Sequence, residues 1–235
     1  MKLPREAAVP GSGVGRLQER LELAKWTAIL TMAVDHYGKI VDPAVFRETH
    51  MIGRVAFPLF AAIIGLRLAA RPDLEGRYLR RLILWAVISQ PIYVLAGRHW
   101  IDGNIMVTLA LGVGVVAVLR RHPGGAGLVL LGGIAVLSWF TSFGPLGVAM
   151  IPAMAILARD HPRTAVAAAG PLGVLANLRA GEPVLDPMDL TALLASPLLA
   201  LSLAIPVRLP RLPGWMFYAF YPAHLLALHL YDLYG

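Results

Sequence analysis

The stretch that decides the fold runs from Leu21 to Leu68 and reads LELAKWTAILTMAVDHYGKIVDPAVFRETHMIGRVAFPLFAAIIGLRL. It contains two strongly apolar runs, each of a length that suits a helix crossing a membrane. Ionisable residues stand at the facing ends of these runs: Asp35-His36 closes the first, and Gly53-Arg54 opens the second. Because ionisable groups at the margin of a membrane segment are costly, the sequence predicts a functional site where the two helices end together.

The composition of the whole chain is typical of a membrane protein. Hydrophobic residues make up 57% of the 235 residues, charged residues make up 15%, and the mean hydropathy is +0.66. A soluble domain carries about 25% charged residues. Since a span takes about 17 to 25 residues, eight or nine spans use nearly the whole chain and leave no room for a soluble catalytic domain. The chain has no cysteine, which excludes disulfides and thiolate nucleophiles.

Apolar runs divide the chain into nine expected spans. The fifth, sixth and seventh are short and rich in Gly, Ala and Pro, so counts of eight and ten stay open. We therefore expect an all-α, polytopic transmembrane helical bundle, in which residues 1–20 form a cytoplasmic N-terminal segment and residues 21–235 form a single transmembrane domain. The nine runs are residues 21–37, 52–69, 79–96, 105–119, 127–139, 146–158, 164–177, 190–206 and 215–231.

The distribution of Lys and Arg among the loops predicts the orientation. With a cytoplasmic N-terminus and nine spans, 16 of the 21 basic residues fall on the cytoplasmic side, and the asymmetry recurs at every second loop. This places the C-terminus outside. A basic belt facing anionic lipid also accounts for the net charge of +7, so no nucleic-acid partner is needed. The five basic residues on the outer side are Lys39, Arg47, Arg54, Arg98 and Arg179.

Polar side chains are predicted to gather at the outer ends of the spans. Asp35 and His36 end the first span, Arg54 begins the second, Asn104 begins the fourth, and His224 lies near the middle of the ninth. An imidazole oriented by a carboxylate can remove a proton from an attacking amine or hydroxyl. An arginine or a carboxamide can polarise a carbonyl or hold a phosphate. These five residues are therefore the candidate catalytic set.

A second candidate cluster lies on the cytoplasmic side, where residues 67–81 contain five arginines. Such a cluster suits a polyphosphate, and Arg77, Arg80 and Arg81 are the candidates for binding it. A topology signal alone would give the same arginines. No metal is expected, since His224 and His229, five residues apart, do not share one helical face.

The outer polar groups also have structural interpretations. Asp35-His36 can be an interfacial helix end, and Arg54 can reach the outer headgroups. His224 can form a hydrogen bond between two helices.

Several short motifs follow one another along the chain, and in them the sequence resembles the TraX family, membrane proteins of conjugative plasmids and their chromosomal relatives. The resemblance covers the first four spans and the ninth, whereas residues 121–212 share only general hydropathy. The motifs are Lys25-Trp26 through Met32, Asp35-His36, Ile52–Phe60 (IGRVAFPLF), Tyr78–Leu82 (YLRRL), Ser89-Gln90-Pro91, Asn104-Ile105 with Thr108-Leu109, and Phe220–Leu225 (FYPAHL).

The resemblance implies an acetyl-CoA-dependent N-acetyltransferase of the bacterial inner membrane. Its acceptor would be the N-terminal amine of a pilin or a similar exported protein, and acetyl-CoA would be its donor substrate. The motif positions that carry over are Asp35, His36, Arg54, Pro58, Arg80, Gln90, Asn104 and His224.

Together these observations suggest direct transfer across the bilayer. We expect the CoA phosphates to bind at the arginine cluster while the thioester enters the bundle. There His36 or His224 would deprotonate the acceptor amine, Asp35 would orient the imidazole, and Asn104 or Arg54 would stabilise the oxyanion.

Two other functions stay open. A proton-coupled transporter would use Asp35 and the histidines as a relay. A non-enzymatic pilus-assembly protein would dock a membrane subunit through the Gly- and Ala-rich fifth to seventh spans.

Overall fold

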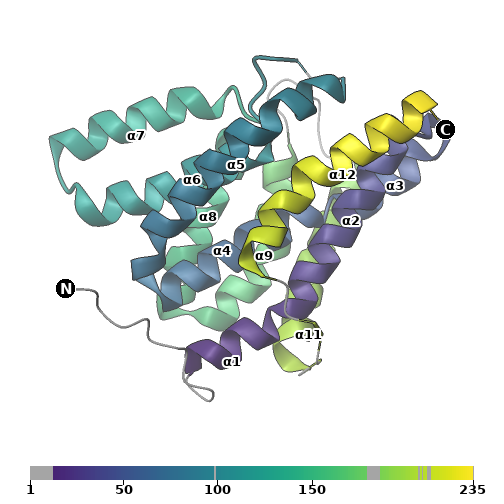
Figure 1. Ribbon diagram of the computed structural model, residues 1–235. Coiled ribbons are helices and arrows are strands. Elements are labelled where there is room, and N and C mark those ends of the chain that lie inside the picture. The colour runs from purple at the N-terminus through teal and green to yellow at the C-terminus, as the bar shows by residue number, and fades with distance from the viewer. Residues whose placement is uncertain are drawn as a thin grey trace.

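The computed structural model describes residues 13–97, 99–178, 186–205, 207, 209–210 and 213–234. These residues form α-helices and short 3-10 turns without any strand, so the expected all-α fold is confirmed (Figure 1). The α-helices are α1 (Gly13–Arg20), α2 (Glu22–Ile40), α3 (Phe46–Gly53), α4 (Ala56–Ala70), α5 (Glu75–Leu95), α6 (Ile105–Arg121), α7 (Gly125–Ser138), α8 (Gly144–Asp160), α9 (Pro162–Asn177), α10 (Pro187–Leu190), α11 (Ala195–Ala204) and α12 (Gly214–Tyr234).

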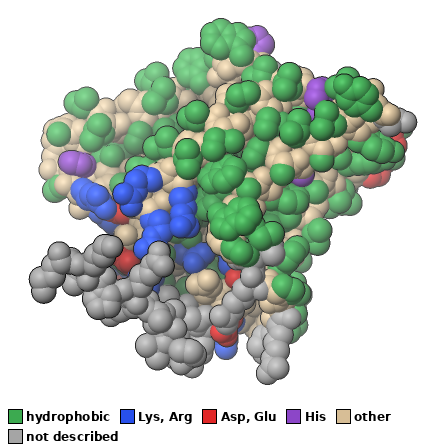
Figure 2. Space-filling view, in the orientation of Figure 1, with side chains coloured by type: hydrophobic (Ala, Val, Ile, Leu, Met, Phe, Trp, Pro, Cys, Tyr) green, Lys and Arg blue, Asp and Glu red, His purple; other side chains and the backbone are tan. Residues whose placement is uncertain are grey.

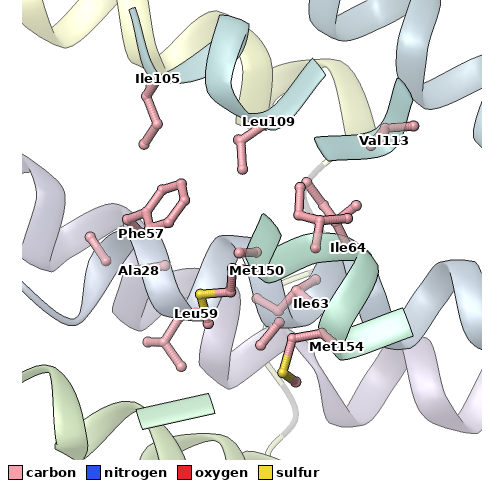
Figure 3. Packing of buried hydrophobic residues seen from close by; sticks show 14 of the residues in the cluster. Ala28, Phe57, Leu59, Ile63, Ile64, Ile105, Leu109, Val113, Met150 and Met154 are labelled. Carbon is pink, nitrogen blue, oxygen red and sulfur yellow. The ribbon is translucent and has the colours of Figure 1, made fainter. Parts of the chain in front are cut away.

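Helix α4 forms the centre of the bundle. Its sequence, AFPLFAAIIGLRLAA, is apolar on almost every side, as expected of a helix surrounded by other helices. Helices α2, α8 and α9 pack around it (Figure 1). Phe57, Leu59 and Ile63 of α4 share the core with Met150 and Met154 of α8 (Figure 3). This core fixes the helices whose ends carry the polar groups described below.

Glycines allow the helices around α4 to approach closely. A Cβ added to Gly65 would lie 2.5 Å from the Met154 Cβ, and one added to Gly173 would lie 2.4 Å from the Pro58 Cγ. Carbon atoms that are not bonded prefer separations of about 3.5 to 4.0 Å. Helices α8 and α9 therefore contact α4 through positions where only glycine fits, a form of packing common between membrane helices.

The outward faces of the peripheral helices are apolar. Val87 on α5 is 68% exposed and Val129 on α7 is 77% exposed. Figure 2 shows hydrophobic side chains over much of one face, with Lys and Arg gathered in a patch near the start of α5. Among the described residues, the helical segments Pro43–Ala70 and Pro187–Ala204 are long and apolar enough to cross a membrane. Exposed apolar surface of this extent indicates association with a membrane.

The bundle has two ends that differ in chemistry. At the first, called here the arginine end, the buried Glu75 at the start of α5 forms ion pairs with Arg120 and Arg121 at the end of α6. At the second, the aspartate end, Asp35 on the last turns of α2 contacts His50 on α3. Helix α5 runs between the ends, and its 21 residues span about 30 Å at about 1.5 Å per residue.

Two expected helix boundaries near the aspartate end were wrong. Helix α2 continues past Tyr37 to Ile40, because Asp42 accepts a hydrogen bond from the Ala44 N–H (3.1 Å) and starts the next turn only there. The expected second span begins at Ala56, since α3 ends at Gly53 and a turn comes next. Arg54 therefore lies between two helices and does not open the long one.

Two other boundaries also differ from expectation. The run 190–206 was expected as one helix, but α10, a 3-10 turn (Thr191–Leu194) and α11 share this region. Helix α5 already begins at Glu75, so the last three arginines of the stretch 67–81 lie in this helix and not in a loop. Apolar composition predicts that a segment is buried or in lipid, but it does not mark where one helix gives way to another.

Some expectations concern residues outside the described part of the chain. The predicted segment 1–20 is described only from Gly13, and Arg98, Arg179 and position 206 are outside it as well. The single transmembrane domain, the span count and the orientation stay predictions.

Candidate functional site

A cavity of about 570 Å³ lies at the aspartate end and is lined by polar side chains from several helices. A smaller compartment of about 90 Å³ shares part of this lining. His36 and Lys39 come from α2, His50 from α3, Arg54 from the turn between α3 and α4, and Tyr93 from α5; all five line both spaces. We call these two spaces together the aspartate-end cavity.

Asp35 is held by groups from two helices. The Lys39 Nζ, one turn later on α2, donates to Oδ2 at 2.5 Å, and the His50 Nδ1 on α3 donates to Oδ1 at 2.6 Å. Both carboxylate oxygens are thereby engaged in charge-assisted contacts that fix the side chain. The nearest ring nitrogen of His36, Nε2, lies 4.0 Å from Oδ2, beyond hydrogen-bond distance. The imidazole that Asp35 orients is therefore that of His50, not that of His36 as expected.

The contact with Asp35 fixes the tautomer of His50. A carboxylate only accepts hydrogen bonds, so the proton of a neutral His50 ring is on Nδ1. Nε2 is then the nitrogen that can accept a proton, and the ring lines the aspartate-end cavity. Phe46 stacks on the same ring with centroids 4.9 Å apart, which limits its rotation. A carboxylate, an oriented imidazole and a cavity are the parts that a general base requires.

His36 and His224 form a second pair, between α2 and α12. The His224 Nδ1 lies 2.7 Å from the Phe220 O, and the His36 Nδ1 lies 2.7 Å from the His224 Nε2. Because a carbonyl only accepts, the His224 Nδ1 carries a proton and its Nε2, in the neutral ring, accepts one from His36. The hydrogen bonds therefore run in one direction, from His36 to the backbone of α12. Such a chain can conduct a proton as well as join two helices.

Arg54 presents a fixed cation to the cavity. Its Nη2 lies 2.9 Å from the Asp189 Oδ1, and its Nη1 donates to the Asn177 Oδ1 at 3.3 Å. The side chain is only 15% exposed, which does not match a guanidinium extended to the membrane surface. Its Nε is buried and has no hydrogen-bond partner among the described residues. That N–H is therefore a buried donor without a partner among the described residues, while the guanidinium as a whole lines the cavity.

Asn104 has a structural role in this fold. It is the N-cap of α6, where its Oδ1 accepts from the Met106 N–H at 2.9 Å. Its Nδ2 donates to the Ala86 O (2.9 Å) and the Gln90 Oε1 (2.8 Å), so both amide hydrogens are engaged. The side chain is fully buried and is absent from the lining of the aspartate-end cavity. Asn104 is therefore engaged as a helix cap in this fold, and its use toward an oxyanion stays a prediction.

The predicted polyphosphate ligands lie far from this cavity. Arg77, Arg80 and Arg81 are exposed on the first turns of α5. Tyr93, which lines the cavity, lies on the same helix 12 residues after Arg81, or about 18 Å at about 1.5 Å per residue. The candidate residues thus divide between the two ends of the bundle, as the sequence predicted.

A third space, called here the inner pocket, lies between the two ends. It measures about 90 Å³ and is mostly apolar, with Lys25, Tyr78 and Tyr218 as its polar members. Met32 and Ile105 line both the inner pocket and the smaller compartment of the aspartate-end cavity. These two buried side chains form a wall that the two spaces share.

Sequence reasoning missed His50, the histidine closest to the carboxylate. The second apolar run was taken to start at Ile52, which left His50 in a loop. One signal was present, since His50 and Arg54 are four residues apart and such residues face the same side of a helix. For metal binding, no suitable group of three or more ligands occurs among the residues that the structure describes.

Comparisons with known proteins give one consistent result. A family model described as TraX protein matches residues 20–231. A Protein TraX from Escherichia coli is 31% identical over 219 residues, which cover 88% of this chain and 85% of that protein. A Protein TraX from Escherichia coli (strain K12) is 29% identical with the same coverage. No solved structure matches the chain.

Proposed function

The chain belongs to the TraX family, as its motifs predicted, and from this premise we propose that it is an integral membrane N-acetyltransferase. Acetyl-CoA is the donor substrate, and the acceptor is the N-terminal amine of a pilin or of a similar exported protein. The chain crosses the bacterial inner membrane about nine times. Its arginine end faces the cytoplasm, where acetyl-CoA is made, and its aspartate end faces the opposite side.

The observation that carries this proposal is the pair formed by Asp35 and His50 on the wall of the aspartate-end cavity. With Nδ1 held by the carboxylate, the Nε2 of His50 takes the proton of the acceptor amine. In this scheme His50 has the role that the sequence suggested for His36 or His224. The direct attack of the amine needs no thiol, in keeping with a chain that has no cysteine.

The remaining groups serve the transition state. The amine nitrogen attacks the thioester carbonyl, the C–N bond forms, and the C–S bond breaks. The carbonyl oxygen gains negative charge, and the positive charge of the Arg54 guanidinium, which lines the cavity, stabilises it. The CoA thiolate leaves and is neutralised by the proton that His50 has taken. His36 lines the same cavity as His50, and its hydrogen bond to His224 joins α2 to α12 beside the site.

Intact-mass spectrometry tests this function directly. A pilin-like acceptor is co-expressed with the protein, with its His50→Ala variant, or alone. We expect the acceptor to gain the mass of one acetyl group, on its N-terminal amine, only when the wild-type protein is co-expressed. An unmodified acceptor in the presence of well-expressed protein would contradict the proposal.

A proton-coupled transporter is the second candidate, and the His36–His224 chain is the observation that favours it. Reconstituted liposomes distinguish the two functions. Flux driven by a pH gradient and lost in His224→Ala would support transport. A pilus-assembly protein would give neither flux nor an added acetyl group.

A further inference from the structure

The scheme proposed above uses no residue of the inner pocket. This pocket combines apolar walls with a buried lysine. Lys25, on α2, is 6% exposed, and its Nζ pairs with the Glu22 Oε1 at 2.5 Å. The same ammonium lies 5.2 Å from the ring centroid of Phe217. A buried cation and apolar walls at the same place suit a ligand that has both an apolar part and polar amide groups.

Arginines stand beside the inner pocket at the arginine end. The guanidinium of Arg67 lies 5.9 Å from the ring centroid of Tyr78, a pocket residue. A Cβ added to Gly214, another pocket residue, would lie 3.5 Å from the Arg81 Nη1. Two cations are therefore positioned next to an apolar space, and arginine pairs well with phosphate.

The other end of the inner pocket leads toward the catalytic groups. Met32 and Ile105 line both this pocket and the smaller compartment of the aspartate-end cavity, and Met32 is one helical turn before the Asp35–His36 pair on α2. A molecule whose phosphates lie at Arg67 and Arg81 would direct its other end toward this shared wall. From the arginine end to the aspartate end, the bundle thus presents the two arginines, the apolar inner pocket, the shared wall and then the general base His50.

We propose that the inner pocket is the binding site for the thioester arm of an acyl-CoA donor. The phosphates of CoA bind at Arg67 and Arg81, the flexible arm occupies the pocket, and the acyl group reaches the wall formed by Met32 and Ile105. This rests on the proposed acetyltransferase function and adds a location for the donor. It also replaces the broad set of α5 arginines with Arg81 and brings in Arg67 from α4.

The chain has no cysteine, so a single introduced thiol reports on the pocket. Leu82 and Ile83 are neighbours on α5, but Leu82 lines the inner pocket and is 1% exposed, whereas Ile83 is 51% exposed on the outer surface. Leu82→Cys and Ile83→Cys are purified in detergent and treated with the mixed disulfide of CoA and 2-thiopyridine. The protein thiolate attacks the CoA sulfur, a new S–S bond forms, the reagent S–S bond breaks, and pyridine-2-thione leaves with the proton.

We expect intact mass to show CoA attached to Leu82→Cys, and excess CoA to abolish this attachment while it leaves any attachment to the exposed Ile83→Cys unchanged. Methyl methanethiosulfonate, a small thiol reagent, should react with both variants and confirms that each thiol is accessible. Three results would overturn the proposal: no CoA on Leu82→Cys although the small reagent reacts, no reaction with either reagent, or attachment to Leu82→Cys that excess CoA leaves unchanged. An alkyl methanethiosulfonate that reacts where the CoA disulfide does not would assign the pocket to a lipid chain.

A second variant tests the wall. In the double variant Ile105→Trp and Leu82→Cys, CoA should still become attached to the cysteine. In the single variant Ile105→Trp, the transfer of acetyl to the acceptor should be lost. Transfer that proceeds normally in Ile105→Trp would contradict the route through the wall. The attachment of CoA needs no acceptor. If CoA is attached to Leu82→Cys but the pilin-like acceptor stays unmodified, the proposed acceptor is wrong while the proposed donor site is still supported.

Discussion

The two ends of the bundle each bury a carboxylate, but they differ in where its partners lie. At the arginine end, the Glu75 side chain is 4% exposed, while its partners Arg120 and Arg121 are 31% and 59% exposed. At the aspartate end, the Asp35 side chain is 11% exposed, and its partners Lys39 and His50 are only 20% and 13% exposed. Arginines that reach water make Glu75 a connector of helices. The partners of Asp35 are enclosed beside a cavity. Burying such a cluster of charges costs free energy, and clusters of this kind are frequent at functional sites, so we infer a functional role for Asp35.

The largest difference between the ends should appear when the general base is removed. His50→Ala is expected to lower the rate of acetyl transfer by about a hundredfold to ten-thousandfold, since the acceptor amine then lacks a base. The rate is measured by mass spectrometry of the acceptor under single-turnover conditions. His122→Ala, an exposed histidine at the end of α6, is the control and should transfer at the wild-type rate. Equal rates in the two variants would remove His50 from the mechanism.

Loss of the carboxylate at the aspartate end should destabilise the protein most. Asp35→Ala removes the buried carboxylate that both Lys39 and His50 contact, and breaking a largely enclosed pair of this kind costs up to about 3 to 5 kcal/mol. The free energy of unfolding in detergent measures the effect. Asp35→Ala combined with Lys39→Met should recover part of the loss, because the half-buried ammonium that faced the carboxylate is then gone. A double variant no more stable than Asp35→Ala would show that the Lys39 charge is not the cause.

Glycine substitutions provide a matched pair, with one position at each end. A Cβ at Gly53 would lie 2.2 Å from the Asp35 Cβ, so Gly53→Ala should displace the carboxylate and lower stability by about 1 to 3 kcal/mol. Gly76, on the first turn of α5, has no atom within 4 Å of an added Cβ. Gly76→Ala should therefore be neutral or stabilise by about 0.5 to 1 kcal/mol. Thermal unfolding of both variants checks this, and equal losses would contradict the close contact at Gly53.

Among the carboxylate variants, the smaller effect is expected at the arginine end. Glu75→Ala removes the ion pairs with Arg120 and Arg121, but both arginines can turn to water, so the cost should be about 1 kcal/mol or less. Acetyl transfer should stay at the wild-type rate. A loss of stability as large as that of Asp35→Ala would mean that the two carboxylates have equivalent roles.

Features that depend on apolar patterning could be predicted from the sequence. The helical bundle, the family, and the separation of Asp35 from the α5 arginines could all be read from hydrophobic runs, charge alternation and short motifs. The meeting of Arg54 with Asn177 and Asp189 could not, since these residues are more than 120 positions apart along the chain. Contacts of this kind depend on how helices pack, and composition does not determine packing.

The partner of Asp35 could not be chosen from adjacency in sequence. His36 is its neighbour, but consecutive residues on a helix point about 100° apart, and His36 faces α12 instead. His50 reaches Asp35 only because the turn at Asp42 reverses the chain and brings α3 back along α2. Likewise, the sequence alone does not distinguish an asparagine that caps a helix from one that lines a site, and Asn104 is the N-cap of α6.

In the proposed function the two ends lie on opposite sides of the membrane, and single introduced cysteines can show on which side each end lies. Glu48, exposed on α3, reports the aspartate end, and Asp73, exposed between α4 and α5, reports the arginine end. Each is replaced by cysteine and treated in intact spheroplasts with a maleimide that cannot cross membranes. We predict that Glu48→Cys is labelled in intact spheroplasts and Asp73→Cys only after lysis. Labelling of both from the same side would contradict transfer across the bilayer.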